Sequence, residues 1–133
     1  MRSSRIVALS ALVILAAVTF FAALAHQHDK PASGGSVTVT GELVDMACYM
    51  SHPETARGES HRGCAQGCLT KGLPMSVLTS GGDLYLLLPD HDNEKVYEQA
   101  RDWAADQVEV KGRLVNQGGI RAVIVADSKK VSK

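Results

Sequence analysis

The chain has 133 residues and equal numbers of basic and acidic side chains, 14 of each, so its formal net charge is zero. Without Arg2 and Arg5 the rest of the chain is slightly acidic, which argues against binding to nucleic acid through an excess of positive charge. The 108 residues after position 25 are enough for one small domain with a single modest core.

The first 25 residues predict export. Arg2 and Arg5 precede an apolar run from Ile6 to Ala25, which ends in the small-x-small cleavage site Ala23-Leu24-Ala25. At about 20 residues the run is also just long enough to span a bilayer. We therefore predict a cleaved signal peptide or an uncleaved N-terminal membrane anchor, and a protein that is periplasmic or anchored to the inner membrane.

Residues 26–35 are polar and rich in turn-forming residues, which predicts a flexible linker. The linker contains His26 and His28. If cleavage follows Ala25, the new amino group, two backbone amides and the His28 imidazole offer Cu(II) the square-planar nitrogen ligands that it prefers. His26 and His28 are therefore a candidate Cu(II) site, and the alternative is an unstructured tail.

Alternating polar and apolar residues from Ser36 predict a strand that leads directly to Asp45 and Cys48. Four more strands are predicted at residues 75–79, 84–88, 107–115 and 120–126, with an amphipathic helix at 94–105. Gly41 and Gly112 interrupt the first and fourth strands, and a glycine inside a strand indicates a sharp bend or a bulge.

This order of elements predicts a mainly β, α+β domain over residues 36–128, followed by a polar tail at 129–133. Five strands with a helix between the third and the fourth are typical of an OB-fold-like barrel. Two short helices are expected, one of them in a Cys/His-bearing insertion between strands 1 and 2, where this fold commonly carries its binding site. A split β/α sandwich is the alternative architecture.

The insertion contains the chemistry-bearing residues. All three cysteines lie between Asp45 and Cys68, together with His52 and His61. Ser60 is the predicted N-cap of a helix over roughly residues 61–71, which Gly72 ends. On that helix, the side chains at positions 61, 64 and 68 point to one side.

Cys64 and Cys68 are four residues apart, so a regular helix separates their Cβ atoms by about 5–6 Å, whereas a disulfide needs about 3.8 Å. A metal ion tolerates this spacing better, because both thiolates can reach an ion between them. The predicted metal ligands are Cys48, His61, Cys64 and Cys68, a set suited to tetrahedral zinc or to Cu(I). Asp45 is a predicted partner of a ligand imidazole, and His52 is an alternative ligand.

Two alternatives remain open. A disulfide from Cys48 to Cys64 or Cys68 would stabilise an exported interaction module that binds another envelope protein, and it would leave one thiol over. A thiol redox protein acting through Cys64 or Cys68 is the other alternative. The chain lacks both a Cys-x-x-Cys motif and a recognisable set of acid, base and nucleophile, so we do not predict an enzyme.

One resemblance adds to this prediction. The segments Val44-Asp45, Cys48-Tyr49, His61-x₂-Cys64-Ala65-x₂-Cys68 and Gly72-Leu73-Pro74 resemble a pattern in small exported, largely uncharacterised bacterial proteins. The resemblance implies an OB-like β-barrel in which Cys48, His61, Cys64 and Cys68 belong to one site. The predicted function is an exported metal-binding domain that holds zinc or copper for a structural purpose or for metal handling.

Overall fold

The structure is a computed structural model, and it describes residues 32–131. The predicted signal peptide or anchor, the first part of the predicted linker and the candidate Cu(II) residues His26 and His28 lie outside the described residues. Within residues 32–131, no helix has the length and the apolar character that are needed to cross a membrane.

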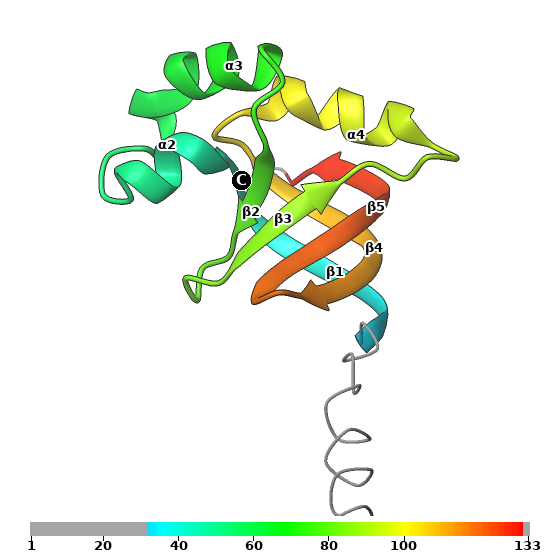
Figure 1. The fold of residues 1–133 in the computed structure, drawn as a ribbon. Helices are drawn as coiled ribbons and strands as arrows, with labels where there is room; N and C mark the ends of the chain where they lie inside the picture. The colour runs from blue at the N-terminus through cyan, green and yellow to red at the C-terminus, as the bar shows by residue number, and fades with distance from the viewer. Residues whose placement is uncertain (1–31, 132–133) are drawn as a thin grey trace, which may run out of the picture. The chain divides into compact units, whose positions relative to one another are not determined.

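Five strands form a closed barrel in the order β1-β2-β3-β5-β4 (Figure 1). They are β1 (Ala32–Asp45), β2 (Met75–Leu78), β3 (Leu84–Leu88), β4 (Gln107–Gln117) and β5 (Ile120–Lys130). The long strand β1 pairs with β4 as far as Glu42 and with β2 from Glu42 onward, which joins the two ends of the sheet. β3 and β5 are parallel, and the other pairs are antiparallel. The predicted five-stranded, OB-fold-like barrel is confirmed.

Within residues 32–131 three α-helices, rather than the two predicted, accompany the barrel and gather at one end of it (Figure 1). The helical elements are α2 (Met46–Ser51), the 3-10 turn η1 (Glu59–His61), α3 (Arg62–Thr70), α4 (Glu94–Ala100) and the 3-10 turn η2 (Arg101–Trp103). Helix α2 was not predicted because six residues are too few to show a helical period. The predicted cap of α3 is wrong by one residue: the N-cap is His61, not Ser60.

Three strands extend beyond their predicted ends: β4 continues two residues further, to Gln117, and β1 and β5 extend into other predicted segments. β1 begins at Ala32, inside the predicted linker, and β5 continues to Lys130, inside the predicted polar tail. Both extensions pair with β4: Ala32 lies opposite Asn116, and Lys130 lies opposite Val108. The strands continue through these segments because hydrogen bonds between strands pair the backbone N–H and C=O groups whatever the side chains are.

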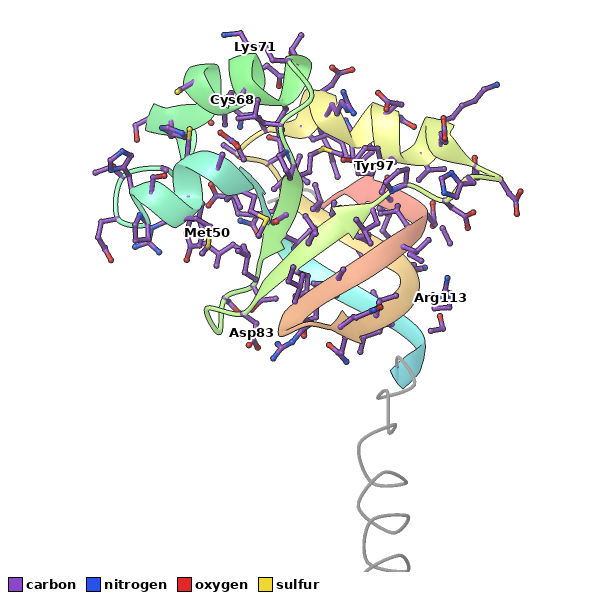
Figure 2. All side chains as sticks on the ribbon, in the orientation of Figure 1. Met50, Cys68, Lys71, Asp83, Tyr97 and Arg113 are labelled. Carbon is purple, nitrogen blue, oxygen red and sulfur yellow. The ribbon has the colours of Figure 1, made fainter. Side chains whose placement is uncertain are left out.

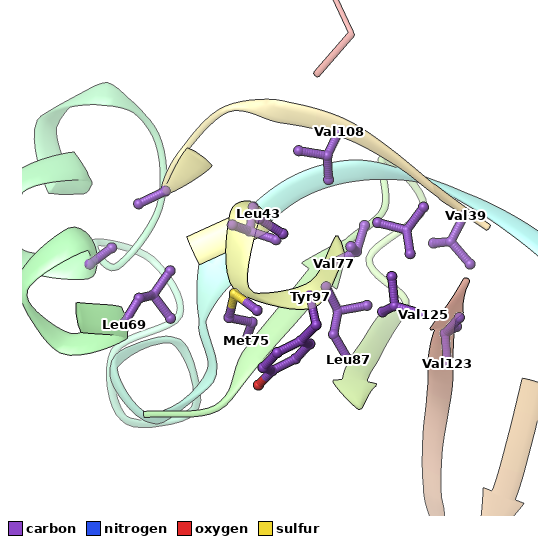
Figure 3. Close-up of a cluster of buried hydrophobic side chains, with 14 residues drawn as sticks. Val39, Leu43, Leu69, Met75, Val77, Leu87, Tyr97, Val108, Val123 and Val125 are labelled. Carbon is purple, nitrogen blue, oxygen red and sulfur yellow. The ribbon is translucent and has the colours of Figure 1, made fainter. Parts of the chain in front are cut away.

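The core fills the barrel and the space below the helices (Figure 3). Its buried strand residues are Val39, Leu43, Met75, Val77, Leu87, Val108, Val110, Val123 and Val125. Helix α4 adds Tyr97 and Ala100, as its predicted amphipathic pattern requires. Helix α3 adds Leu69, which is fully buried, so the insertion shares the core of the barrel.

Gly41 and Gly112 lie where strands approach each other too closely for a side chain. A Cβ atom on Gly41 would lie 2.2 Å from the Leu78 carbonyl oxygen, and one on Gly112 would lie 2.0 Å from the Ile124 carbonyl oxygen. The ladder between β4 and β5 shifts its register next to Gly112. The predicted bend or bulge is therefore confirmed at Gly112, whereas Gly41 lies at a close approach of β1 to β2.

We expect Gly41→Ala to destabilise the domain by about 1–3 kcal/mol, because the new methyl group must displace the backbone of β2. Gly35→Ala is the matched control, since a Cβ atom there would meet nothing within 4 Å. Urea unfolding followed by circular dichroism measures both variants. Equal stability of the two would contradict the close approach of β1 to β2.

Candidate metal centre

The junction between β1 and α2 positions the first cysteine. Asp45 ends β1 opposite Met75, and its Oδ1 atom accepts a hydrogen bond of 3.0 Å from the Ala47 backbone N–H, which caps α2. The Met46 backbone N–H donates to the Pro74 carbonyl at 3.0 Å. Cys48 therefore lies in the first turn of a helix whose start is fixed to the barrel.

Polar contacts anchor α3, which carries the other two cysteines, to the segment after α4. The Arg62 guanidinium donates to the Ala104 carbonyl at 2.7 Å and to the Asp106 carboxylate at 2.9 Å. Asp106 also pairs with Lys130, at the end of β5, at 2.6 Å. The Gln66 side-chain amide donates to the Arg101 carbonyl at 2.9 Å. Together with the buried Leu69, these contacts fix the direction of α3.

Helix α3 is ended by Gly72, as predicted. Gly72 has a positive φ of 89°, and its backbone N–H donates to the Leu69 carbonyl at 2.9 Å. The Leu73 N–H donates to the Cys68 carbonyl at 3.2 Å. This pair of hydrogen bonds is a Schellman motif, and it ties the backbone of Cys68 to the turn that follows.

These two helices bring the three thiols together. The Sγ atoms of Cys48, Cys64 and Cys68 all lie within 4.8 Å of one another, and those of Cys48 and Cys68 are 3.9 Å apart. Two thiolates bound to one tetrahedral zinc ion at about 2.3 Å each would be about 3.8 Å apart. A disulfide would bring the sulfur atoms to about 2.05 Å, so the three cysteines are free thiols at a separation that suits a shared ion.

The cluster is open on one side. Cys48 and Cys68 are half-buried, whereas Cys64 is exposed. Figure 2 shows Cys68 on α3, and Met50 reaching out from α2. An ion held by the three thiols would therefore be shielded by two of them and reachable from solvent past the third.

A buried carboxylate lies beside the cluster. Asp45 is fully buried beside Cys48 and Cys68. Hydrogen bonding of the thiol to this carboxylate is the main cause of the raised pKa of Cys48, which reaches about 12, and burial of the thiol adds to the effect. The same carboxylate, followed by burial, raises the pKa of Cys68. In the absence of a cation both thiols are therefore protonated at neutral pH.

Neither predicted imidazole ligand belongs to the three-thiol group that the structure forms within residues 32–131. His61 lies at the N-terminus of α3, and its Nε2 atom is buried without a hydrogen-bond partner. The His52 side chain is exposed at the end of α2. The roles of His61 and His52 as ligands remain predictions.

Sequence reasoning missed the residues that hold the site in place. Arg62 is the first residue of α3, where a positive charge is unfavourable to the helix dipole. This unfavourable position was the one feature of the sequence that could have indicated an acidic partner for Arg62 elsewhere in the chain. The partner, Asp106, is 44 residues away and has no local signature.

The fold and site define a small closed β-barrel with a cluster of three thiols in the insertion after its first strand. No family model, curated protein or solved structure matches the chain. The resemblance to small exported bacterial proteins therefore remains an expectation from the sequence.

We expect Asp45→Asn to make Cys48 more reactive. Asparagine still caps α2, but it removes the negative charge that holds the thiol in its protonated form, so the pKa of Cys48 should fall. At pH values below the pKa of Cys48, each pKa unit by which it falls increases the thiolate fraction by about ten-fold, and the alkylation rate increases with it.

The measurement is the rate of iodoacetamide modification of Cys48 between pH 8 and 10 in metal-free protein, read by mass spectrometry of the peptides. Asp127→Asn, a change at an exposed aspartate on β5, is the control. Identical Cys48 rates in the two variants would show that Asp45 does not govern this thiol.

Proposed function

We propose that this protein is an exported metal-binding domain that holds a thiophilic ion, zinc or copper, through Cys48, Cys64 and Cys68. The observation that carries the proposal is the convergence of three free thiols from two separate helices within 4.8 Å. Thiolates select zinc and Cu(I) over hard cations such as Mg²⁺ and Ca²⁺. The chemistry of the donors therefore defines the class of ion.

The surroundings of the thiols support the binding of a cation. The Asp45 carboxylate is fully buried beside Cys48 and Cys68. A buried negative charge is costly, and positive charge near it would offset that cost. A bound cation would also displace the protons of Cys48 and Cys68, because a metal binds thiolates rather than thiols.

The fourth ligand depends on the ion. Zinc in a structural site takes four ligands, and His61, with its unpartnered Nε2 atom, is our candidate for the fourth. The second imidazole, His52, is the alternative and lies exposed at the end of α2. The ion would serve the domain either by joining α2 to α3 or as cargo.

One observation favours a second function. The Sγ atoms of Cys48 and Cys68 are 3.9 Å apart, and a small movement of α2 would allow a disulfide that ties the insertion together. In that case the protein would be a disulfide-stabilised envelope module with Cys64 as a free, exposed thiol. The two functions differ in the oxidation state of two cysteines, which can be measured.

The test is metal analysis and thiol titration of full-length protein purified anaerobically from the cell envelope. We expect one zinc or copper ion per chain and three reduced thiols. Cys48→Ser and Cys68→Ser should each lower metal occupancy by at least about ten-fold, because loss of one ligand or even of its partner typically weakens metal binding by that order.

Ser51→Ala, on an exposed position of α2, is the matched control and should keep the metal. Metal-free protein with one reduced thiol and two oxidised cysteines would favour the disulfide module instead. Recovery of the protein in the cytosolic fraction would contradict export.

A further inference from the structure

Two glycines in α3 have no structural explanation. Gly63 and Gly67 are inside the helix, where glycine is less favourable than alanine. Neither has a positive φ, and a Cβ atom at either position would meet nothing within 4 Å. Packing and backbone geometry therefore do not require glycine at these positions.

Both glycines lie close to the exposed thiol in the sequence. Gly63 precedes Cys64 and lies on another side of the helix, whereas Gly67 lies three residues after Cys64 and is its neighbour on the helix surface. All three residues are exposed. The absence of a side chain at 67 leaves that flank of the Cys64 thiol uncovered, and the absence of one at 63 leaves the adjoining helix backbone open, so that a second molecule can approach closely.

We propose that the three-thiol site is an exchange site for Cu(I), which passes the ion through Cys64 to the thiolates of a partner protein docked over Gly63 and Gly67. This proposal rests on the proposed function, because it requires that the thiols bind a metal. It adds the identity of the ion, the route of transfer and the kind of partner.

The geometry points to Cu(I) rather than to a structural zinc ion. A structural zinc ion would need His61 as a fourth ligand and a site closed to solvent, whereas the three thiols form a group without that imidazole and Cys64 is exposed. Cu(I) is soft, prefers thiolates and is stable with three of them. An open three-thiolate site therefore suits an ion that arrives and leaves by ligand exchange.

The transfer step is a ligand exchange without oxidation or reduction. A partner thiol loses its proton and forms a new Cu–S bond, and the bond from Cu(I) to the Cys64 sulfur breaks. The released Cys64 thiolate then takes up a proton, so charge and protons balance and copper stays Cu(I). The bonds from Cu(I) to the Cys48 and Cys68 sulfur atoms break in the same way as further partner thiolates bind the ion.

The partner that fits this surface presents its own thiols on a protruding loop or helix end. A small chelator needs little space around Cys64, but a folded partner must seat against the helix. The structure thus predicts that bulk at position 67 affects transfer to a protein and leaves the affinity for the ion unchanged.

The experiment uses full-length protein loaded anaerobically with one equivalent of Cu(I). Bathocuproine disulfonate, a small chelator, measures the affinity, and a small folded domain with an exposed Cys-x-x-Cys pair serves as the acceptor in stopped-flow transfer. We expect Gly67→Leu to slow transfer by at least about ten-fold, because docking of specific patches limits association, and to leave the affinity within about two-fold.

Thr70→Leu is the matched control: it places the same side chain on an exposed position of α3 that is not adjacent to Cys64, and it should transfer at the wild-type rate. Gly67→Ala should raise the melting temperature, since alanine favours the helix and meets no neighbour. A lower melting temperature would show that Gly67 is structural and would overturn the inference.

The outcomes separate this inference from the proposed function. Wild-type transfer rates in Gly67→Leu would overturn the docking role of this surface. Tight binding of zinc without binding of Cu(I) would overturn the exchange site and retain a metal-binding domain. Failure to bind either ion would overturn both.

Discussion

The position of Asp45 is the constraint on which the site depends. This one residue ends β1, caps α2 and lies fully buried beside two thiols. A carboxylate in that place holds Cys48 and Cys68 in their protonated form, and it provides a negative charge that a cation can offset. The barrel thus determines the protonation of the thiols as well as their position, because the strand that closes the sheet also supplies the carboxylate.

The barrel also supports two helices that would not be stable in isolation. Helix α2 has six residues and α3 has nine, which is too short for stability in water without tertiary contacts. Leu69 joins α3 to the common core, and Arg62 joins it to Asp106. Cysteines on elements anchored in this way are held at a fixed separation, so the binding of an ion, as proposed, would need little reorganisation.

The sequence was sufficient for the barrel and only partly so for the site. Period-two alternation predicted five strands and Gly112 predicted a bend or bulge, because both signals are local. The convergence of Cys48 with Cys64 and Cys68 was predicted from their density in the insertion. Helix α2 and the contact from Arg62 to Asp106 were missed, since one is too short to be periodic and the other joins distant segments.

The ion pairs around Asp106 link the insertion to the last strand of the domain. Arg62 approaches this carboxylate from α3, and Lys130 approaches it from the end of β5. Arg62, followed by Lys130, lowers the pKa of Asp106, so the stabilisation is present at neutral pH and is lost only as acid protonates the carboxylate below its ordinary range. Fraying of β5 at Lys130 would therefore loosen one support of α3. Strand β5 thus helps to hold in place a thiol cluster that lies more than 50 residues earlier in the sequence.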